Sequence, residues 1–407
     1  NGDKYKTGKT TPDGKPDPSV FSTPHNREGI QVGTAVALLA RLEQHTSPAS
    51  IHFRDFWGDA KREELLQSLG QTRNAATTVE PVLALGIPFR QMATEVNYTT
   101  WPLLEDVFPT SFPGVQTSRD DALVSLTRDQ LQERMIAYYS PDVSDESISA
   151  IAPRLMQNTA RFDAIATRRK LQQIGVDAGQ FLRFDYRPFD TRWLFWEPDT
   201  KLLDEKRSEY ISNILDSNLW IAAVQQNRKQ YDAPSPHRNV TCRHAIERGA
   251  NLFPMFLRPV ARKGELFVAV DTSREIDGNN ANLSDSGLEY LQAMKGIADH
   301  PHLFHHAIAI LHAPSYAAEN AAALRQDWPR VPLPAERQRL LASAELGRQV
   351  AAMLDPETKV NGVTSGKLSS ALKAVGQPTK TGGGNFTDED YSVTARWGIA
   401  GKGGVTM

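Results

Sequence analysis

Residues 186–210 combine the side chains with the clearest potential for chemistry in this sequence. Aromatic residues there are interleaved with Arg187, Arg192, Lys206 and Arg207. Guanidinium groups bind phosphates and guanine edges, while aromatic rings stack on bases or pack in a core. The same residues would also suit a core hairpin whose charged side chains face the solvent. The acidic residues of the segment mean that its charge alone does not favour a nucleic acid, so both interpretations remain open.

The segment that follows, residues 225–263, is the strongest electrostatic signal. It holds eight basic residues against the acidic pair Asp232 and Glu247. A local surplus of positive charge supports phosphate contacts, although the same residues could form a solvated face that pairs with acidic helices. We therefore predict that any DNA contact lies within residues 181–263, through the side chains of Arg187, Arg192, Arg207, Arg228, Lys229, Arg238 and Arg243.

Other reactive patterns are incomplete. Gly8, Lys9 and Thr10 end like a phosphate loop, but the glycine that this motif requires five residues before Gly8 is Asp3. The histidines His302 and His306 have the i,i+4 spacing of a zinc pair on a helix, yet no third ligand stands at a motif distance. We expect no metal site, no catalytic residue and no cofactor-binding residue in this chain.

The composition is that of a globular protein with local rather than global basic character. The 407 residues are 40% hydrophobic and 23% charged, with a formal net charge of −2. A DNA-binding face would have to be built by segregating charge within the fold. The single cysteine, Cys242, allows no internal disulfide, is expected to be buried, and fits a cytoplasmic location. No apolar run is long enough to span a bilayer, so we expect no membrane association.

Periodicity and capping signals predict the order of the elements. Residues 30–42 favour a strand or a helix, 51–57 a strand, and 59–69 a helix with Asp59 as its N-cap. Thr127 and Gln130 have capping-box spacing at the start of a helix. Further segments are predicted as two helices in 143–172, strands in 181–275, two helices in 283–313, and helices at 316–325 and 334–354.

Taken together, several segments in order resemble the type ISP restriction–modification enzymes, single polypeptides with nuclease, helicase-like, adenine-N6 methyltransferase and target-recognition parts. Residues 16–41 and 51–69 resemble late methyltransferase strands and the following helix, and WPLLEDVFPTSFPGVQTSRD at 101–120 resembles the join to the recognition region. The blocks YRPFDTRWLFWE, NLFPMFLRP and the segment 303–334 resemble parts of the C-terminal specificity domain.

The resemblance implies that target recognition lies within this chain and that methyl transfer lies in another part of the enzyme. Methyltransferases of this kind carry a Gly-rich cofactor loop and an Asn/Asp-Pro-Pro-Tyr/Phe motif that holds a flipped adenine. This sequence contains no Asn-Pro-Pro or Asp-Pro-Pro tripeptide. The chain is therefore expected to begin after the catalytic motif, so that S-adenosylmethionine would serve the full-length enzyme and not these residues.

The predicted architecture is α/β and α+β, with a partial methyltransferase-like sheet followed by a mixed α+β DNA target-recognition domain. We assign 1–80 to methyltransferase-like strands, 81–140 to a connector, 141–358 to the specificity domain and 359–407 to a Gly/Lys-rich tail. The expected function is sequence-specific recognition of double-stranded DNA, with the upstream methyltransferase, helicase and nuclease domains as partners. The alternatives are an active methyltransferase completed by another chain, or a structural module that docks a protein.

Overall fold

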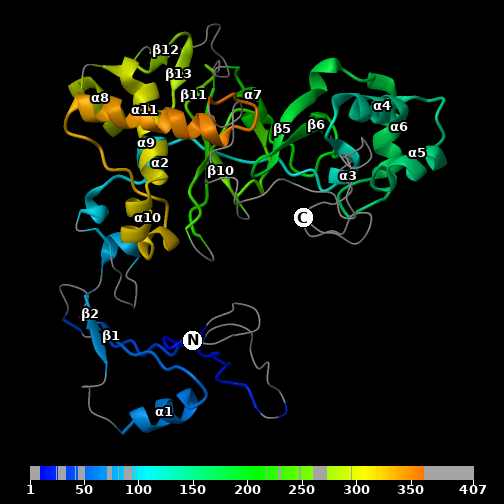
Figure 1. Cartoon of the computed structure of the whole chain (residues 1–407). Coiled ribbons are helices and arrows are strands. Elements are labelled where there is room, and N and C mark those ends of the chain that lie inside the picture. The colour runs from blue at the N-terminus through cyan, green and yellow to red at the C-terminus, as the bar shows by residue number, and fades with distance from the viewer. Residues whose placement is uncertain are drawn as a thin grey trace. The chain divides into compact units, whose positions relative to one another are not determined.

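The computed structural model divides the chain into two units, Asn1–Thr94 and Glu95–Met407 (Figure 1). The structure describes residues 10–23, 25, 34–41, 43–44, 51–70, 76–80, 82–86, 94–95, 97–216, 218–227, 231–246, 249–259, 273–294 and 296–361. No helix in these ranges is long and apolar enough to cross a membrane.

The described residues of the first unit form a short antiparallel pair, an α-helix and the 3-10 helix Leu83–Leu85. Strand β1 (Ile51–Phe53) pairs with β2 (Thr77–Val79), and α1 (Lys61–Ser68) lies between them in sequence. The predicted strand and helix are thus confirmed, but Asp59 is not the N-cap, because that position is Ala60 and no side chain caps the helix. Residues 34–41 form neither helix nor strand, whereas 30–33 and 42 lie outside the described residues.

A buried ion pair joins distant segments of this unit. Lys61 Nζ lies 2.6 Å from Asp17 Oδ1, which also accepts a hydrogen bond from the backbone N–H of Gly58 at 2.8 Å. Asp17 and Lys61 are 0% and 4% exposed. A buried charge needs such a partner, so the pair explains how a lysine can occupy the inner side of α1.

Three small sheets organise the second unit. The first has the order β4-β6-β5-β9, the second β3-β10-β7-β8 and the third β11-β13-β12. Pairing is antiparallel except between β5 and β9, where Phe184 lies opposite Val240 and Asp185 opposite Thr241. The strands are β3 (Phe112–Pro113), β4 (Val124–Ser125), β5 (Phe181–Arg187), β6 (Asp190–Phe195), β7 (Trp220–Ala223), β8 (Ser235–His237), β9 (Val240–Thr241), β10 (Asn251–Pro254), β11 (Phe256–Leu257), β12 (Glu275–Ile276) and β13 (Asn279–Ala281).

The helices gather at the two ends of this unit, with strands between them (Figure 1). At one end lie α3 (Asp120–Leu123), α4 (Arg128–Tyr139), α5 (Asp145–Ile151) and α6 (Ala164–Ile174). At the other end lie α2 (Leu104–Val107), α8 (Asp285–Met294), α9 (His300–Leu311), α10 (Pro314–Asn320) and α11 (Arg337–Leu354). The remaining helix, α7 (Ser208–Ser212), follows the strand pair β5–β6 in sequence. The predicted mixed α+β architecture is confirmed.

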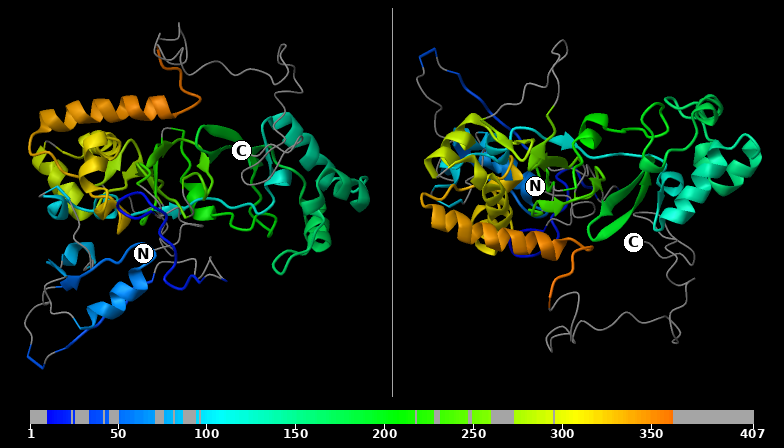
Figure 2. Two further views of the ribbon diagram at one scale, coloured as in Figure 1. Left: turned by 60° about the horizontal axis from the view of Figure 1, so that its bottom comes forward. Right: turned by 90° about the horizontal axis from the view of Figure 1, so that it is seen from above.

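Apolar spacing explains these helices well, whereas the predicted caps are less accurate. Thr127 is the N-cap of α4, as predicted, but its side chain makes no capping bond, and Gln130 instead accepts a hydrogen bond from Ser125. Helix α11 runs alongside the end helices in both views of Figure 2. It approaches α9 closely at Gly347, where a Cβ atom would overlap the carbonyl oxygen of His305.

The core lies between the sheets and the helices α3–α6. Strand β7 is buried at all four residues, as expected for a strand flanked by β8 and β10. Leu104 and Phe108, within the predicted connector, are fully buried in the second unit, and Phe108 meets Phe304 of α9 with ring centroids 5.1 Å apart. The boundaries at residues 80, 140 and 358 remain predictions.

Candidate nucleic-acid interface

The aromatic run identified in the sequence forms the β5–β6 hairpin and the segment after it. Strands β5 and β6 pair from Phe181↔Phe195 to Arg187↔Asp190, so that Pro188 and Phe189 form the tip. Tyr186 and Phe195 are 2% and 0% exposed. The hairpin is therefore part of the core, and only some of its cations reach the surface.

Arg192 is turned inward. Its Nε donates to Asp190 Oδ1 at 2.8 Å and its second amino group donates to Asp190 Oδ2 at 2.6 Å. The guanidinium also lies 4.4 Å from the ring centroid of Tyr186. Since residues i and i+2 share one face of a strand, this pairing follows from the local sequence. Arg192 thus stabilises the hairpin, as the core interpretation of the run anticipated.

Arg187 also packs on Tyr186, with its guanidinium 4.1 Å from the ring centroid. One amino group donates to the carbonyl oxygen of Tyr186 at 2.6 Å and lies 3.1 Å from Cys242 Sγ. Burial raises the pKa of the Cys242 thiol, although the nearby Arg187 charge opposes this shift. Cys242 is 5% exposed and unpaired, which confirms the predicted buried cysteine.

Arg207 and Arg238 are held differently. Arg207 has a left-handed backbone (φ 53°), lies 3.4 Å from Glu205, and its buried Nε has no hydrogen-bond partner within the described part of the chain. Arg238 is half-exposed at its side chain and lies 3.4 Å from Asp355. Among the five predicted side chains that the structure describes, Arg238 is the one that lines both of the recesses described below.

The remaining predicted residues do not all lie within the structure's described ranges. Arg243 is half-buried, and its backbone N–H donates to the carbonyl oxygen of Val115 at 2.9 Å. Arg228 and Lys229 lie outside the described residues. Their contribution to a DNA contact stays a prediction.

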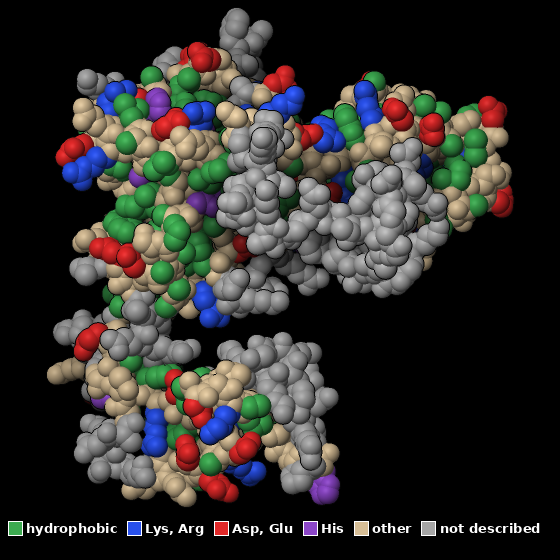
Figure 3. Space-filling model, viewed as in Figure 1, with side chains coloured by type: hydrophobic (Ala, Val, Ile, Leu, Met, Phe, Trp, Pro, Cys, Tyr) green, Lys and Arg blue, Asp and Glu red, His purple; other side chains and the backbone are tan. Residues whose placement is uncertain are grey.

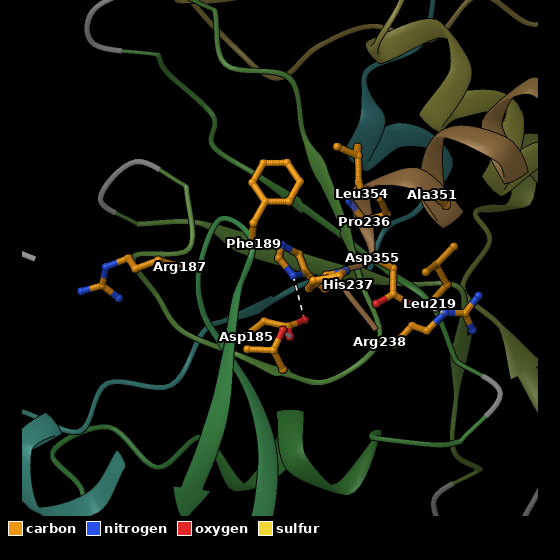
Figure 4. A pocket seen from close by; sticks show the side chains of 12 residues that line it. Asp185, Arg187, Phe189, Leu219, Pro236, His237, Arg238, Ala351, Leu354 and Asp355 are labelled. Atoms are coloured by element: carbon orange, nitrogen blue, oxygen red, sulfur yellow. Dashed lines mark hydrogen bonds and ion pairs between the residues drawn. The ribbon is translucent and has the colours of Figure 1, made fainter. Parts of the chain in front are cut away.

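Two neighbouring recesses open beside Arg238. The first joins the β5–β6 tip to the end of α11, with Arg187, Phe189, Pro236, Arg238 and Leu354 in its wall (Figure 4). The second adds the imidazole of His305 from α9 and the guanidinium of Arg348 from α11, which share its lining with Arg238. Burial lowers the pKa of His305. The carboxylates Asp355 and Glu345 pair with the two arginines, so the recesses carry mixed charge.

A largely buried polar network in the wall of the first recess was not predicted from the sequence. The Asp185 carboxylate, 7% exposed, accepts hydrogen bonds from Thr191 (3.0 Å), Asn239 (3.0 Å) and His237 Nδ1 (2.9 Å) (Figure 4). Burial alone would raise the pKa of Asp185, but these hydrogen bonds and the His237 interaction outweigh it and lower the pKa. The period-two spacing of Ser235, His237 and Asn239 was the available signal, since it places the three residues on one face of an extended segment.

The network has the order hydroxyl, imidazole, carboxylate. Ser235 Oγ lies 2.6 Å from His237 Nε2, and His237 in turn contacts Asp185. Hydrolases use the same order to activate a nucleophile. Ser235, however, lines neither of the two recesses, whereas His237 and Asp185 line the first. The arrangement instead fixes the β8–β9 segment, and with it Arg238, against β5.

The two helical histidines are both engaged. His306 hydrogen-bonds Ser343 through Nδ1 and the carbonyl oxygen of Pro332 through Nε2 (2.7 Å), whereas His302 lies 3.3 Å from Asp299. Within the described ranges no three His, Cys, Asp or Glu side chains gather closely enough to hold a metal ion.

Comparison with known proteins places these features in a family context. Residues 106–376 match the family model of the Type ISP C-terminal specificity domain. The sequence is not similar enough to any curated protein to count as a match.

Three solved structures share parts of the fold. They are a nuclease-deletion mutant of the Type ISP restriction–modification enzyme LlaGI with a DNA substrate mimic (17% identity, TM-score 0.44), the DrdV–DNA complex (19%, 0.46) and the ATP-dependent Type ISP enzyme LlaBIII bound to DNA (14%, 0.49). The matches cover 76%, 72% and 76% of this chain but only 28%, 29% and 20% of the solved chains. The chain thus spans less than a third of the length of these enzymes.

Proposed function

This chain belongs to the Type ISP family through its C-terminal specificity domain, and from this premise we propose that it recognises the DNA target sequence of a restriction–modification enzyme. The observation that carries the proposal is the match of residues 106–376, which includes the whole β5–β6 hairpin and both recesses. Specificity domains select a sequence by contacts to base edges, while phosphate contacts set the register.

The charge of this surface favours attraction of DNA by a few local cationic side chains and not by the net charge of the chain. On the face shown in Figure 3, Lys and Arg side chains are interspersed with Asp and Glu. Arg238 and Arg348 are half-exposed or more, whereas their carboxylate partners Asp355 and Glu345 are 16% and 49% exposed. The exposed pair of Arg348 with Glu345 is worth little, so a DNA phosphate can replace that carboxylate at small cost. Arg228 and Lys229 would extend the same cationic segment along the chain.

Methylation belongs to the whole enzyme in this proposal. S-adenosylmethionine would be bound by the upstream methyltransferase domain, since this chain has no Asn/Asp-Pro-Pro-Tyr/Phe motif to hold a flipped adenine. Helicase and nuclease domains of the parent polypeptide would act on the DNA that this domain selects, as in defence against phage. The buried, unpaired Cys242 suits the reducing cytoplasm in which such DNA would be met.

Selection of bound duplexes from a random pool, followed by binding titrations at two salt concentrations, tests the proposal. The full chain is incubated with a random-sequence duplex pool, and the retained duplexes are sequenced and titrated at two salt concentrations. We expect a shared sequence among the retained duplexes, and Arg238→Ala should lower the salt slope by about one if Arg238 holds a phosphate. Arg339→Ala is the matched control, because Arg339 is also exposed and paired with a glutamate but lies at the other end of α11.

The outcomes separate the candidate functions. Retention of duplexes without any shared sequence would contradict sequence recognition, and absence of DNA binding would favour the protein-docking alternative. The double replacement of Arg228 and Lys229 by Ala should weaken binding to all duplexes and reduce the slope by about two, because each side chain would neutralise one phosphate. An unchanged slope in a folded protein would remove this pair from the interface.

A further inference from the structure

Phe189 is the one large side chain of the β5–β6 hairpin, all of which the structure describes, that is mostly exposed. It is 68% exposed at the tip of the hairpin, whereas Tyr186 and Phe195 in the same strands are buried. A phenylalanine in water forfeits the stabilisation that its burial would bring. The folding of the hairpin therefore does not explain the choice of this residue.

The backbone at the same position is also unfavourable for phenylalanine. Phe189 has a φ of 59°, in the left-handed region. Glycine, asparagine and aspartate adopt this conformation readily in two-residue hairpin turns, whereas a bulky side chain adopts it rarely. Strained backbone and an exposed apolar ring at one residue are together typical of a functional position.

The tip that carries the ring is rigidly mounted. Arg187 and Asp190 are paired across the two-residue tip, and Pro188 fixes the backbone before Phe189. Below it, Asp190 is held by the ion pair with Arg192, and Thr191 donates to Asp185 at 3.0 Å. A rigid mount reduces the entropy lost when an exposed side chain is inserted into a partner.

The surroundings favour a partner with bases and phosphates. Arg187 and Arg238 line the same recess as Phe189 and lie on opposite sides of it in Figure 4. The recess also contains the carboxylates of Asp185 and Asp355, and Arg238 is its half-exposed cation. An exposed aromatic ring beside a half-exposed cation matches a base step, in which stacked bases adjoin a phosphate chain. Proteins that kink a duplex insert apolar side chains between base steps in this way.

We propose that Phe189 inserts between two adjacent base pairs of the bound duplex, unstacking one step and kinking the DNA beside the base contacts. The proposal rests on the proposed function, DNA recognition by this domain, and adds a shape-dependent component to it. A flexible step such as TA or CA would be unstacked at lower cost, so the site would select such a step without a hydrogen bond to it.

The test uses the full chain and a duplex recovered from the random pool by the wild-type protein. The duplex carries 2-aminopurine at successive positions, or a donor and an acceptor dye at its ends. The variants are Phe189→Asn, which removes the ring and suits the left-handed backbone, and Phe189→Trp, which keeps an aromatic wedge. Phe21→Asn is the control, because Phe21 is 53% exposed and lies in the other unit of the chain.

We expect the wild-type protein to raise 2-aminopurine fluorescence at one step and to shorten the end-to-end distance. Phe189→Asn should abolish both signals, weaken binding by about fivefold or more, and raise the melting temperature by about 2 °C, since the strain is relieved. Phe189→Trp and Phe21→Asn should keep both signals.

Two other results would overturn the inference. If Phe189→Asn binds and bends the duplex like the wild type, the wedge is excluded while DNA recognition stands. If the variant instead melts at a lower temperature with unchanged DNA signals, Phe189 serves to pack against Leu354 of α11. A wild-type protein that retains no duplex from the pool would remove the proposed function itself, and the wedge with it.

Discussion

The Asp185 carboxylate shows how one buried charge can organise a surface. Its donors come from β6, from β8 and from the turn before β9, so a single side chain connects three segments of the second unit. Removing the carboxylate would leave those donors without an acceptor, at a cost of about 1–3 kcal/mol for each group that stays buried. Arg238 lies directly between His237 and Asn239 and depends on this arrangement for its position.

Because the pKa of Asp185 is lowered in the folded protein, the free energy of unfolding depends on pH. Because the folded-state pKa lies below the unfolded value of about 3.9, the stabilisation is present above about pH 4 and is lost as the pH falls through the folded pKa. Thermal unfolding of the wild type and of Asp185→Asn, followed from about pH 5 to about pH 2, isolates this contribution because the other carboxylates are common to both. The wild type should lose more of its melting temperature than the variant over this range. Parallel curves would contradict the assignment.

At the scale of elements, Arg168 joins three helices. It is fully buried on α6, and its guanidinium donates to the carbonyl oxygens of Tyr138 (2.9 Å), Ser140 (3.0 Å) and Val143 (2.6 Å). These carbonyls end α4 and precede α5, where helix geometry leaves acceptors without partners. Asp145, the first residue of α5, neutralises the charge.

Replacing Arg168 by Lys should be strongly destabilising. The point charge of lysine cannot reproduce the planar fork, so buried carbonyls would lose their donors and the free energy of unfolding should fall by about 3 kcal/mol or more. Arg169→Lys is the matched control, because Arg169 pairs with the same Asp145 at 2.8 Å but is half-exposed. Its effect should stay within about 1 kcal/mol in denaturant titrations. Equal effects would show that Arg168 does not hold the helices together.

The close contact between α9 and α11 requires a glycine at position 347. Gly347→Ala would place a Cβ atom against the backbone of His305, so α11 would have to shift away from α9. We expect a loss of about 1–3 kcal/mol in the free energy of unfolding, measured by denaturant titration. In Gly70→Ala the new Cβ atom would meet nothing closer than 3.9 Å, so this control should change stability much less. A neutral effect of Gly347→Ala would mean that the helices are farther apart.

At the scale of the whole molecule, residues 106–376 form the part of the chain that matches the Type ISP C-terminal specificity domain. It spans 28%, 29% and 20% of the three solved chains that share parts of its fold. Its formal net charge of −2 and the mixed face in Figure 3 confine attraction for DNA to local groups.

The chain alone should transfer no methyl group. The expectation rests on the sequence, which contains no Asn/Asp-Pro-Pro-Tyr/Phe motif of the kind that holds a flipped adenine beside a methyl donor. Incubation with tritiated S-adenosylmethionine and mixed-sequence DNA should leave the DNA at the level of a no-protein control. Transfer above that level would contradict the prediction and support the alternative of a complete methyltransferase.

The sequence alone determined the kinds of elements and the family. Helices α5, α6, α8, α9 and α11 and the strand-rich segment could be predicted, because apolar spacing is a property of neighbouring residues. The burial of Cys242 and the ordered blocks of the specificity domain were likewise readable.

Only the tertiary structure decided which side chains remain available for DNA. Arg187 and Arg192 pack against Tyr186, whereas the side chain of Arg238 is half-exposed. The amino-acid composition does not distinguish these three arginines. The parallel pairing of β5 with β9 brings Asp185 to Asn239 across 54 residues, and the packing of α11 completes the recess beside Phe189. Such contacts depend on strand register and helix packing between distant segments, and local sequence patterns carry no information about either.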